Sequence, residues 1–316
     1  MTTLWEEFER LGGAATSPLK SGQFRVAYVG EHLMLGIDGG GLVCALVEAP
    51  RPANTPAVFD LSGVQAYYAP NVEISIGSQE RRTGCVVVRC RNSEPEVQRY
   101  FLGVWGVISD SLSSRPTVEE VMNGVDRLVS LFARVSAPSE ETITGFVGEL
   151  VFLSSLVPLP EGVRAWHRNP QDRFDFVYEA LRIEVKTTIH SQRRHVFSYD
   201  QANATHNAYV ASILLEETDS GTTVSDLLDD IVARCSAYPE LQMKVWDMVG
   251  GTLGQCAGPV MRRAVALESS IGSLRFFKME DIPAIRGALP QGLTAVHFRS
   301  DLGAAHQIAA PVELRR

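Results

Sequence analysis

Lysine is scarce in this chain of 316 residues. Only four of the 29 basic residues are lysines, at positions 20, 186, 244 and 278, and the others are arginines. The chain also has no uninterrupted apolar run near the 18 residues that a membrane span needs, which excludes a membrane-spanning helix. The first nine residues are acidic and lack a basic segment followed by an apolar one, so they do not form a signal peptide. We therefore expect a cytoplasmic protein.

Cysteines are few and have no short paired spacing. The five cysteines stand at positions 44, 85, 90, 235 and 256, an odd number. This spacing argues against a disulfide framework and against a zinc site. We expect free, buried thiols, as in a reducing compartment.

Positive charge is also in deficit. The net charge is −8, which argues against a surface coated with positive charge for binding nucleic acid. The charge is uneven, because residues 164–195 carry seven Arg or Lys, three His and only four Asp or Glu. A local basic surface is therefore expected in that region.

Turn signals and apolar runs divide the chain into four parts. Short apolar runs, separated by Gly, Pro and Asn, predict a β-rich N-terminal domain over 1–112; these runs are 24–29, 41–47, 72–76, 84–90 and 100–107. Gly39, Gly40 and Gly41 lack the spacing of a nucleotide loop and predict a hairpin turn. A connecting helix over 113–138 begins at the capping box of Thr117 and Glu120. Residues 139–220 form a core, and 221–316 form a helical and α/β extension.

The order of elements in the core is helix, three strands, helix, strand. Ser139 caps a helix that we expect over about 140–156. The strands are expected at 163–167, 174–178 and 181–188, the short helix near 199–206, and a fully buried strand at 208–215. Beyond the core, a helical region over 223–255 and strands at 272–278 and 293–299 are predicted. The fold class is therefore α/β.

Lys186 is the most informative of the four lysines. It follows Glu184 by two residues in a predicted strand, so the two side chains share one face. Ile183, Val185 and Thr187 point to the opposite face, into a core. A compact, titratable ammonium beside a carboxylate is a role that Arg does not fill. An exposed ion pair within the sheet is the alternative reading of Glu184 and Lys186.

Two further acids are expected near this pair. Asp175 lies one strand earlier, and an antiparallel turn brings its carboxylate within a few ångströms of Glu184. Two carboxylates about 4 Å apart repel by roughly 4 kcal/mol at an effective dielectric near 20, which a divalent cation would offset. Glu149 follows Gly145 and Gly148 on a predicted helix, and glycine destabilises a helix. A close approach of this helix to the sheet would explain the two glycines and would bring Glu149 to the edge of the site. Otherwise, Glu149 would be a helix residue facing solvent.

These residues resemble the PD-(D/E)XK nuclease superfamily. The match rests on Asp175, the Glu184-Val185-Lys186 run and the helical Glu149, and it extends to bacterial PD-(D/E)XK motif proteins found beside restriction and phage-defence genes. Phe174 stands where the motif's proline would precede the aspartate. The resemblance implies a restriction-endonuclease-like αβββαβ core. It also implies Mg²⁺, with Mn²⁺ as a substitute, bound by Asp175, Glu184, the Val185 carbonyl and Glu149, with Lys186 orienting or activating water.

Phosphodiester hydrolysis also requires contacts to a nucleic-acid backbone. Polar donors around the motif are candidates for these contacts: Arg168, His190, Arg193, Arg194, His195 and Gln201. Arg193 and Arg194 could instead form a simple charged loop. We interpret His167 as structural and Asp172 as a turn residue that could serve as an alternative ligand.

The resemblance implies a Mg²⁺-dependent DNA endonuclease of a bacterial restriction or phage-defence system. Expected partners are DNA, a second copy of the chain, and an ATPase or methyltransferase from the same operon. The alternative is a catalytically silent DNA-binding or scaffold subunit of a defence complex, which the acidic net charge favours. A third reading is an RNA nuclease with the same site.

Overall fold

The computed structural model describes residues 4–13, 19, 22–30, 33–52, 58–61, 63–132, 138–169, 172–204, 207–311 and 314. These residues form a mixed α/β structure that divides into two compact units. The first unit contains residues 1–137 and 242–259, and the second contains residues 138–241 and 260–316. The expected four-part division stays a prediction, and the grouping of 242–259 with the N-terminal residues is a feature that it did not include.

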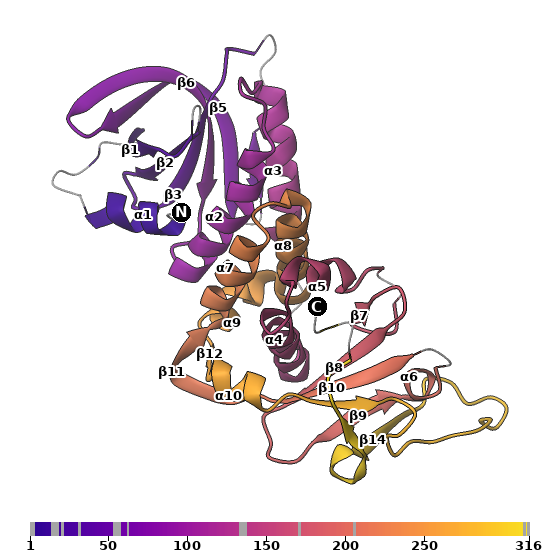
Figure 1. Ribbon diagram of the computed structural model, residues 1–316. Coiled ribbons are helices and arrows are strands. Elements are labelled where there is room, and N and C mark those ends of the chain that lie inside the picture. The colour runs from indigo at the N-terminus through magenta and orange to yellow at the C-terminus, as the bar shows by residue number, and fades with distance from the viewer. Residues whose placement is uncertain are drawn as a thin grey trace. The chain divides into compact units, whose positions relative to one another are not determined.

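The strands of the first unit form a closed barrel. They pair in the order β1-β2-β3-β6-β5-β4, and β1 also pairs in parallel with β5. Their bounds are β1 Gln23–Tyr28, β2 Leu33–Asp38, β3 Val43–Glu48, β4 Phe59–Leu61, β5 Val64–Ile76 and β6 Gln79–Cys90 (Figure 1). Inward-facing side chains fill the barrel with a buried cluster: Phe24, Val26, Met34, Cys44, Leu46, Val72, Ile74, Cys85 and Val87. The β-rich character expected for this part of the chain is thus confirmed for the strands.

The glycine triplet lies in the turn between β2 and β3. Asp38 Oδ1 accepts hydrogen bonds from the backbone N–H groups of Gly40 at 2.9 Å and Leu42 at 3.0 Å. Gly41 has φ +79°, a conformation that glycine adopts without steric cost. The hairpin prediction is confirmed.

One predicted strand of the N-terminal part is wrong. Residues 100–107 lie in helix α2 (Pro95–Asp110), which follows helix α1 (Leu4–Gly13) and the barrel strands in sequence. Pro95 stands in the first turn of α2, where a proline fits because its missing N–H is not needed. Because α2 buries side chains around much of its circumference, its apolar run has no clear helical period and reads as a buried strand.

The expected connecting helix is α3 (Val118–Phe132). Thr117 Oγ1 accepts from the Glu120 backbone N–H at 3.2 Å, as the capping box predicts. The Glu120 carboxylate, however, accepts from the Ser113 backbone N–H and hydroxyl. Only the Thr117 half of the box is therefore confirmed.

The second unit contains a five-stranded sheet in the order β15-β13-β10-β8-β7. In this sheet, β8 runs parallel to β10 and antiparallel to β7. Separate two-stranded pairs are β14 with β9 and β11 with β12. The strand bounds are β7 Phe176–Val177, β8 Arg182–Thr188, β9 Arg194–Ser198, β10 Ala208–Leu214, β11 Glu217–Thr223, β12 Ala264–Val265, β13 Arg275–Lys278, β14 His297–Asp301 and β15 Gln307–Ile308.

Helices of the second unit follow the prediction in part. The bounds are α4 Glu140–Ser154, α5 Leu159–Ala165, α6 Tyr199–Ala202, α7 Val224–Arg234 and α10 Leu267–Gly272. Ser139 caps α4 by accepting from the Thr142 N–H, as expected. The predicted helical region 223–255 is interrupted between α7 and α8 (Pro239–Leu253). After α8 come a 3₁₀ turn (Gly254–Cys256) and α9 (Ala257–Met261), and a second 3₁₀ turn spans Leu302–Ala304.

The strand expected at 163–167 is also wrong. Residues up to Ala165 belong to α5, whose first turn contains a proline, and Trp166 makes only an isolated bridge to Phe176. The strand expected at 174–178 shortens to β7, whereas β8 and β10 match the strands expected at 181–188 and 208–215. Strand β9 was not predicted, because no strand was expected between residues 188 and 208.

Strand β8 is covered on both faces. On one face, α4 approaches so closely that a Cβ added at Gly148 would lie 1.7 Å from Thr187 Oγ1. On the other face, the Lys186 ammonium lies over the ring of Phe197 in β9, 5.2 Å from its centroid. Figure 1 shows this order, with α4 on one side of β8 and β10 and the β9–β14 pair on the other. The predicted close approach of α4 is confirmed at Gly148, whereas a Cβ at Gly145 would meet nothing within 4 Å.

All five cysteines are free thiols; four are buried as expected, whereas Cys256 is partly exposed.

Candidate metal centre

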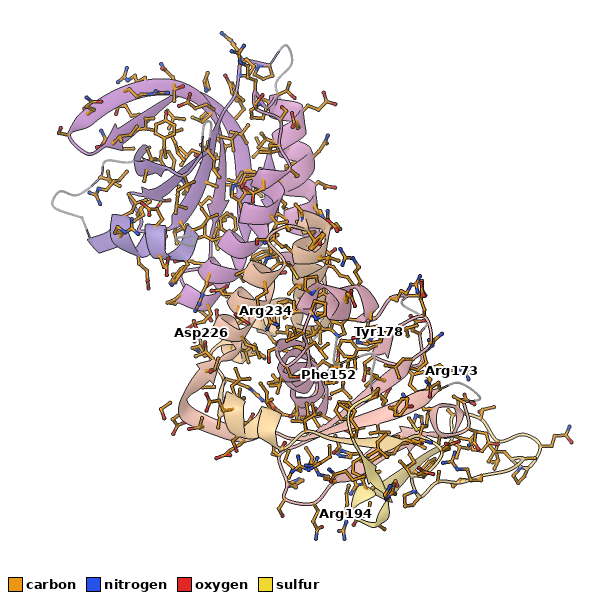
Figure 2. The ribbon with its side chains drawn as sticks, viewed as in Figure 1. Phe152, Arg173, Tyr178, Arg194, Asp226 and Arg234 are labelled. Atoms are coloured by element: carbon orange, nitrogen blue, oxygen red, sulfur yellow. The ribbon has the colours of Figure 1, made fainter. Side chains whose placement is uncertain are left out.

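Asp175 is tied to β8 through its side chain. It immediately precedes β7, which pairs with β8 so that Phe176 lies opposite Ile183. Asp175 Oδ2 accepts a hydrogen bond from the backbone N–H of Val185 at 2.7 Å. Phe152 of α4, labelled in Figure 2, packs its ring against that of Phe176 in β7, with the two ring centroids 4.8 Å apart. The antiparallel turn therefore holds the Asp175 carboxylate beside the middle of β8, as the sequence predicts.

Glu184 and Lys186 form an ion pair on one face of β8. The Lys186 ammonium lies 2.7 Å from Glu184 Oε1, and the Glu184 residue is only 4% exposed. Glu184 Oε2 is buried, and no described residue donates a hydrogen bond to it. A buried carboxylate oxygen without a partner is costly, so this atom suits a ligand that is not part of the chain.

Glu149 reaches the same region from α4. Its Oε2 atom accepts a hydrogen bond from Trp166 Nε1 at 2.6 Å and lies 3.0 Å from His167 Nε2. The side chain is 15% exposed, which rules out the reading of Glu149 as a helix residue facing solvent. The close contact of Gly148 with β8 accounts for this position, because it carries the next residue of α4 toward the sheet.

His167 is a member of this cluster that the sequence interpretation assigned to a structural role. Its Nε2 atom lies 3.9 Å from Asp175 Oδ1, and its backbone N–H donates to the Asp175 carbonyl at 2.6 Å. Its φ angle is +38°, a left-handed conformation that typically costs about 1–3 kcal/mol in residues other than glycine. Among the described residues, ligand atoms of Glu149, His167 and Asp175 all lie within 4.8 Å of one another. Glu184 lies outside that group, next to Asp175.

Burial and mutual repulsion raise the pKa of two carboxyl groups. For Asp175, desolvation raises the pKa well above its ordinary value, and the negative charges of Glu184 and Glu149 raise it further. The hydrogen bond from the Val185 N–H and the charge of Lys186 lower this pKa, but by less. Desolvation also raises the pKa of Glu184, although Lys186 opposes it. Burial lowers the pKa of Lys186, but the three acids more than offset this effect, so its pKa is raised and the ammonium stays charged.

The donor set fits a divalent cation. Carboxylate oxygens, a backbone carbonyl and water are the ligands of Mg²⁺ and Mn²⁺, and these ions stabilise carboxylates that burial would otherwise protonate. Both the repulsion among the acids and the unpartnered Glu184 Oε2 are features that such an ion would relieve. The residues present therefore fit the metal that the sequence motif implies.

Three of the six predicted backbone-contact residues are exposed. Arg168 follows His167, and His190 lies in the turn after β8. Arg194 is exposed on β9, in an ion pair with Asp301 at 3.0 Å, and Figure 2 shows it at the outer margin of the β9–β14 pair. These three stay candidates for contacts to a phosphate backbone.

The other three have internal partners. His195 is 4% exposed and its Nε2 lies 2.8 Å from Ser212 Oγ, so the predicted phosphate contact is wrong for this residue. Arg193 donates to the carbonyl oxygens of Ser212 and Ser273, which commits its guanidinium to joining β10 to the residues before β13. Gln201 Oε1 accepts from the Ser198 N–H at the start of α6, and its amide donates to the Arg173 carbonyl. Gln201 is nonetheless close enough to lower the pKa of Glu184.

The sequence interpretation missed His167 and Trp166. Reading residues 163–167 as a strand placed both residues away from Asp175, whereas α5 ends at Ala165 and turns the chain back toward β7. The proline in the first turn of α5 was the available signal for a helix. Asp172, by contrast, accepts from the Asn169 N–H at 2.8 Å, in agreement with its interpretation as a turn residue.

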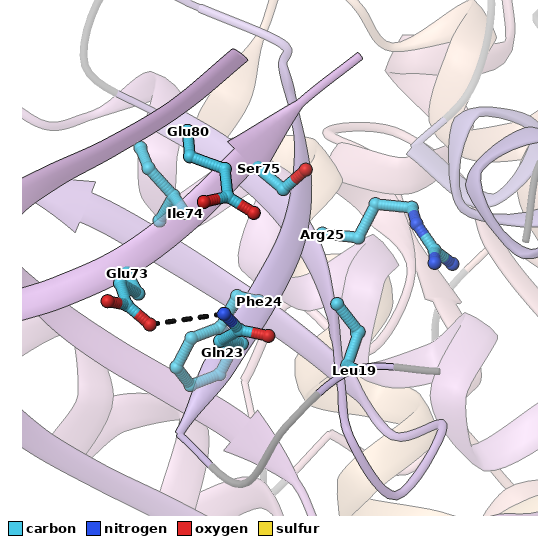
Figure 3. Close-up of a pocket in the computed structure, with 8 residues that line it drawn as sticks. All are labelled: Leu19, Gln23, Phe24, Arg25, Glu73, Ile74, Ser75 and Glu80. Atoms are coloured by element: carbon cyan, nitrogen blue, oxygen red, sulfur yellow. Dashed lines mark hydrogen bonds between the residues drawn. The ribbon is translucent and has the colours of Figure 1, made fainter. Parts of the chain in front are cut away.

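The first unit has a small pocket of about 120 Å³ at the closure of its barrel (Figure 3). Gln23 on β1 donates to Glu73 on β5 across it at 3.1 Å, and Glu73 also pairs with Arg82. Arg25, Ser75 and Glu80 are the other polar residues of the lining. Because Glu73 is already paired within the protein, the pocket is a less suitable cation site than the centre around Asp175.

Among the residues that the structure describes, no helix is long and apolar enough to cross a membrane.

Comparison with known proteins identifies the family. A protein-family model described as "Putative PD-(D/E)XK family member, (DUF4420)" matches residues 4–303. No curated protein and no solved structure gives a significant match. The family description indicates a nuclease-like function and does not specify the metal ion or the substrate. Since the match spans nearly the whole chain, this protein belongs to that PD-(D/E)XK family, in agreement with the motif around Lys186.

Proposed function

We propose that this protein is a Mg²⁺-dependent DNA endonuclease, with Mn²⁺ as an effective substitute. The observation that carries the proposal is the burial of Glu184 beside Lys186, with one Glu184 oxygen unpartnered among the described residues and the Asp175 side chain only 16% exposed. Glu149 completes a group of three carboxylates around one point of β8. Such a group is costly for the folded protein unless it serves to bind a cation.

Each residue then has a defined task. Asp175, Glu184, Glu149 and the Val185 carbonyl would hold the ion, which would supply a Lewis acid for the phosphoryl oxygen and for the attacking water. Lys186 stabilises the charge that develops on the phosphoryl group. Glu184 Oε1 fixes the Lys186 ammonium at 2.7 Å, and Phe197 supports it from β9. Arg168, His190 and Arg194 would contact the DNA backbone.

The element order supports a restriction-endonuclease-like core. From α4 onward, the chain forms α4, β7, β8, β9, α6 and β10, which is the αβββαβ order with α5 added after the first helix. We propose that residues 139–220 are this catalytic core. The barrel of the first unit would then serve target recognition or partner docking.

The biological setting follows from the family resemblance. We place the protein in the cytoplasm, as a component of a restriction or phage-defence system with an ATPase or methyltransferase partner. Cleavage of both DNA strands by one site per chain favours a homodimer.

The proposal is tested by nicking of supercoiled plasmid DNA in Mg²⁺ or Mn²⁺, with and without the products of neighbouring genes. Lys186→Ala removes the group that stabilises transition-state charge and should lower the cleavage rate by about 10²–10³-fold, with folding and Mn²⁺ binding largely retained. Lys278→Ala is the matched control, because Lys278 is an exposed lysine on β13. Cleavage by the Lys186→Ala protein at the wild-type rate would contradict the proposal.

A silent DNA-binding or scaffold subunit is the second candidate. The net charge of −8 favours it, because proteins that bind duplex DNA alone usually carry more positive charge. It predicts that the wild-type protein binds its partners without cleaving DNA under any of these conditions. Cleavage that depends on Lys186 and Glu184 excludes it.

A further inference from the structure

We propose that His167 is a direct ligand of the metal ion, through Nε2, together with Glu149 and Asp175. The imidazole would make the site prefer Mn²⁺, or a similar transition-metal ion, to Mg²⁺. This inference deepens the proposed function, on which it rests for the use of the ion. It concerns a residue outside the Asp175, Glu184 and Lys186 motif.

The spacing of the ligand atoms supports a shared ion. Adjacent ligands of an octahedral ion with bonds near 2.1 Å lie about 3 Å apart. His167 Nε2 lies 3.0 Å from Glu149 Oε2 and 3.9 Å from Asp175 Oδ1. Small rotations of the Asp175 and His167 side chains would place all three atoms around one ion.

The backbone around His167 holds the ring in place. The residue has a left-handed φ of +38°, and its N–H is bonded to the Asp175 carbonyl at 2.6 Å. The preceding residue, Trp166, is fully buried and donates its indole N–H to Glu149. The same short turn therefore orients one proposed ligand, Glu149, and anchors another, Asp175. Backbone strain of this kind, held in place by contacts to Asp175 and Glu149, is typical of a functional position.

A second observation points to a ligand at this place. Glu184 is only 4% exposed, and its buried Oε2 atom accepts no hydrogen bond from any residue that the structure describes. The centre thus offers at least one buried oxygen donor beyond the group of Glu149, His167 and Asp175. A mixture of carboxylate oxygens and one imidazole nitrogen binds Mn²⁺ more tightly than Mg²⁺, which prefers oxygen ligands alone.

The test measures bound Mn²⁺ by pulsed electron paramagnetic resonance, which detects magnetic coupling to a directly bound nitrogen. The wild-type protein should show ¹⁴N coupling, and labelling with [¹⁵N]histidine should convert it to ¹⁵N coupling without any substitution. His167→Asn should remove the coupling and weaken Mn²⁺ binding at least tenfold, with a smaller effect on Mg²⁺. Asn tolerates the left-handed backbone, and His306→Asn, at an exposed residue just before β15, is the matched control.

The outcomes separate this inference from the proposed function. Bound Mn²⁺ without histidine coupling in the labelled wild-type protein overturns the inference, whether or not the variant folds. Coupling that persists in His167→Asn also overturns it, and so does the absence of Mn²⁺ binding by the wild-type protein. Histidine coupling without any DNA cleavage would sustain the inference while contradicting the nuclease proposal.

Discussion

Glu184 divides its two carboxylate oxygens between two roles. Oε1 holds the Lys186 ammonium at 2.7 Å, and Oε2 is buried without a partner. An ion bound at Oε2 would leave the Lys186 contact intact, so metal binding and positioning of the lysine do not compete. This arrangement explains why the chain has a lysine at this position although it otherwise prefers arginine. A forked guanidinium would not fit between Glu184 and the Phe197 ring as a point charge does.

His195 illustrates how burial changes the role of a polar residue. It lies on β9, faces Ser212 in the neighbouring sheet, and is almost inaccessible to solvent. Desolvation, Lys186 and Arg193 lower its pKa to about 4, so the folded protein keeps it neutral at pH 7. The residue supports β9 behind Lys186 and has no surface available for DNA.

This shift predicts an acid-dependent loss of stability. The unfolded chain protonates His195 near pH 6.5, whereas the folded protein does so only near pH 4, so stability falls as the pH is lowered between these values. The contribution lost is about 3 kcal/mol. Urea unfolding at pH 7 and pH 4.5 should therefore show a steeper loss of stability for the wild-type protein than for His195→Gln.

The comparison with His195→Gln isolates this histidine, because the acidic residues titrate equally in both proteins. An identical pH dependence in the two proteins would contradict the assignment of His195 as a buried, neutral residue.

At the scale of elements, the position of α4 determines whether Glu149 belongs to the site. Gly148 touches Thr187 of β8, and only the missing side chain permits this distance. Glu149 follows on the next position of α4 and meets Trp166 and His167 at the end of α5. The metal centre is thus assembled from the interior of α4, the turn after α5, the residue before β7 and strand β8.

Two glycines of α4 provide a matched pair of substitutions. Gly148→Ala would bring a Cβ to 1.7 Å from Thr187 Oγ1, so α4 must shift, and we expect a loss of about 1–3 kcal/mol in the free energy of unfolding. Gly145→Ala meets nothing within 4 Å and should stabilise the helix by about 0.4–1 kcal/mol. Chemical unfolding measures both effects, and Mn²⁺ affinity should fall only for Gly148→Ala. Equal stability of the two variants would contradict the close packing of α4 on β8.

Sequence patterns predicted the central elements better than the peripheral ones. Strands β8 and β10 have seven residues each, and β10 is apolar apart from Ser212, so their type and limits could be recognised. Strand β9 pairs only with β14, about a hundred residues later, and no local pattern reveals such a partner. Residues 100–107 and 163–167 are apolar runs in helices, and a short apolar run alone does not distinguish a helix from a buried strand.

The site shows the same limit. Asp175 stands directly before β7, and Glu184 and Lys186 lie on the neighbouring strand β8, so their spacing was readable from the sequence. His167 reaches the site through the turn after α5, where its backbone is in a left-handed conformation. No residue type in this segment predicts that conformation from the sequence.

At the scale of the whole molecule, the chain forms two compact units of different kinds. The first is a closed barrel with helices, and it includes residues 242–259 from far along the sequence. Within this unit, a Cβ at Gly103 of α2 would lie 2.3 Å from the Trp246 ring of α8, which shows how tightly the returning segment packs. Such a contact between distant segments could not be inferred from composition or periodicity.

The second unit contains all the proposed catalytic groups, so the central claim concerns this unit alone. The claim is that Glu149, Asp175 and Glu184 bind one divalent ion beside Lys186. The most direct measurement is the anomalous diffraction of crystals of the full chain soaked in Mn²⁺. We predict a single Mn²⁺ peak in contact with oxygens of all three carboxylates and with the Val185 carbonyl. A structure in which these carboxylates are splayed apart, with no Mn²⁺ between them at saturating concentration, would contradict the account.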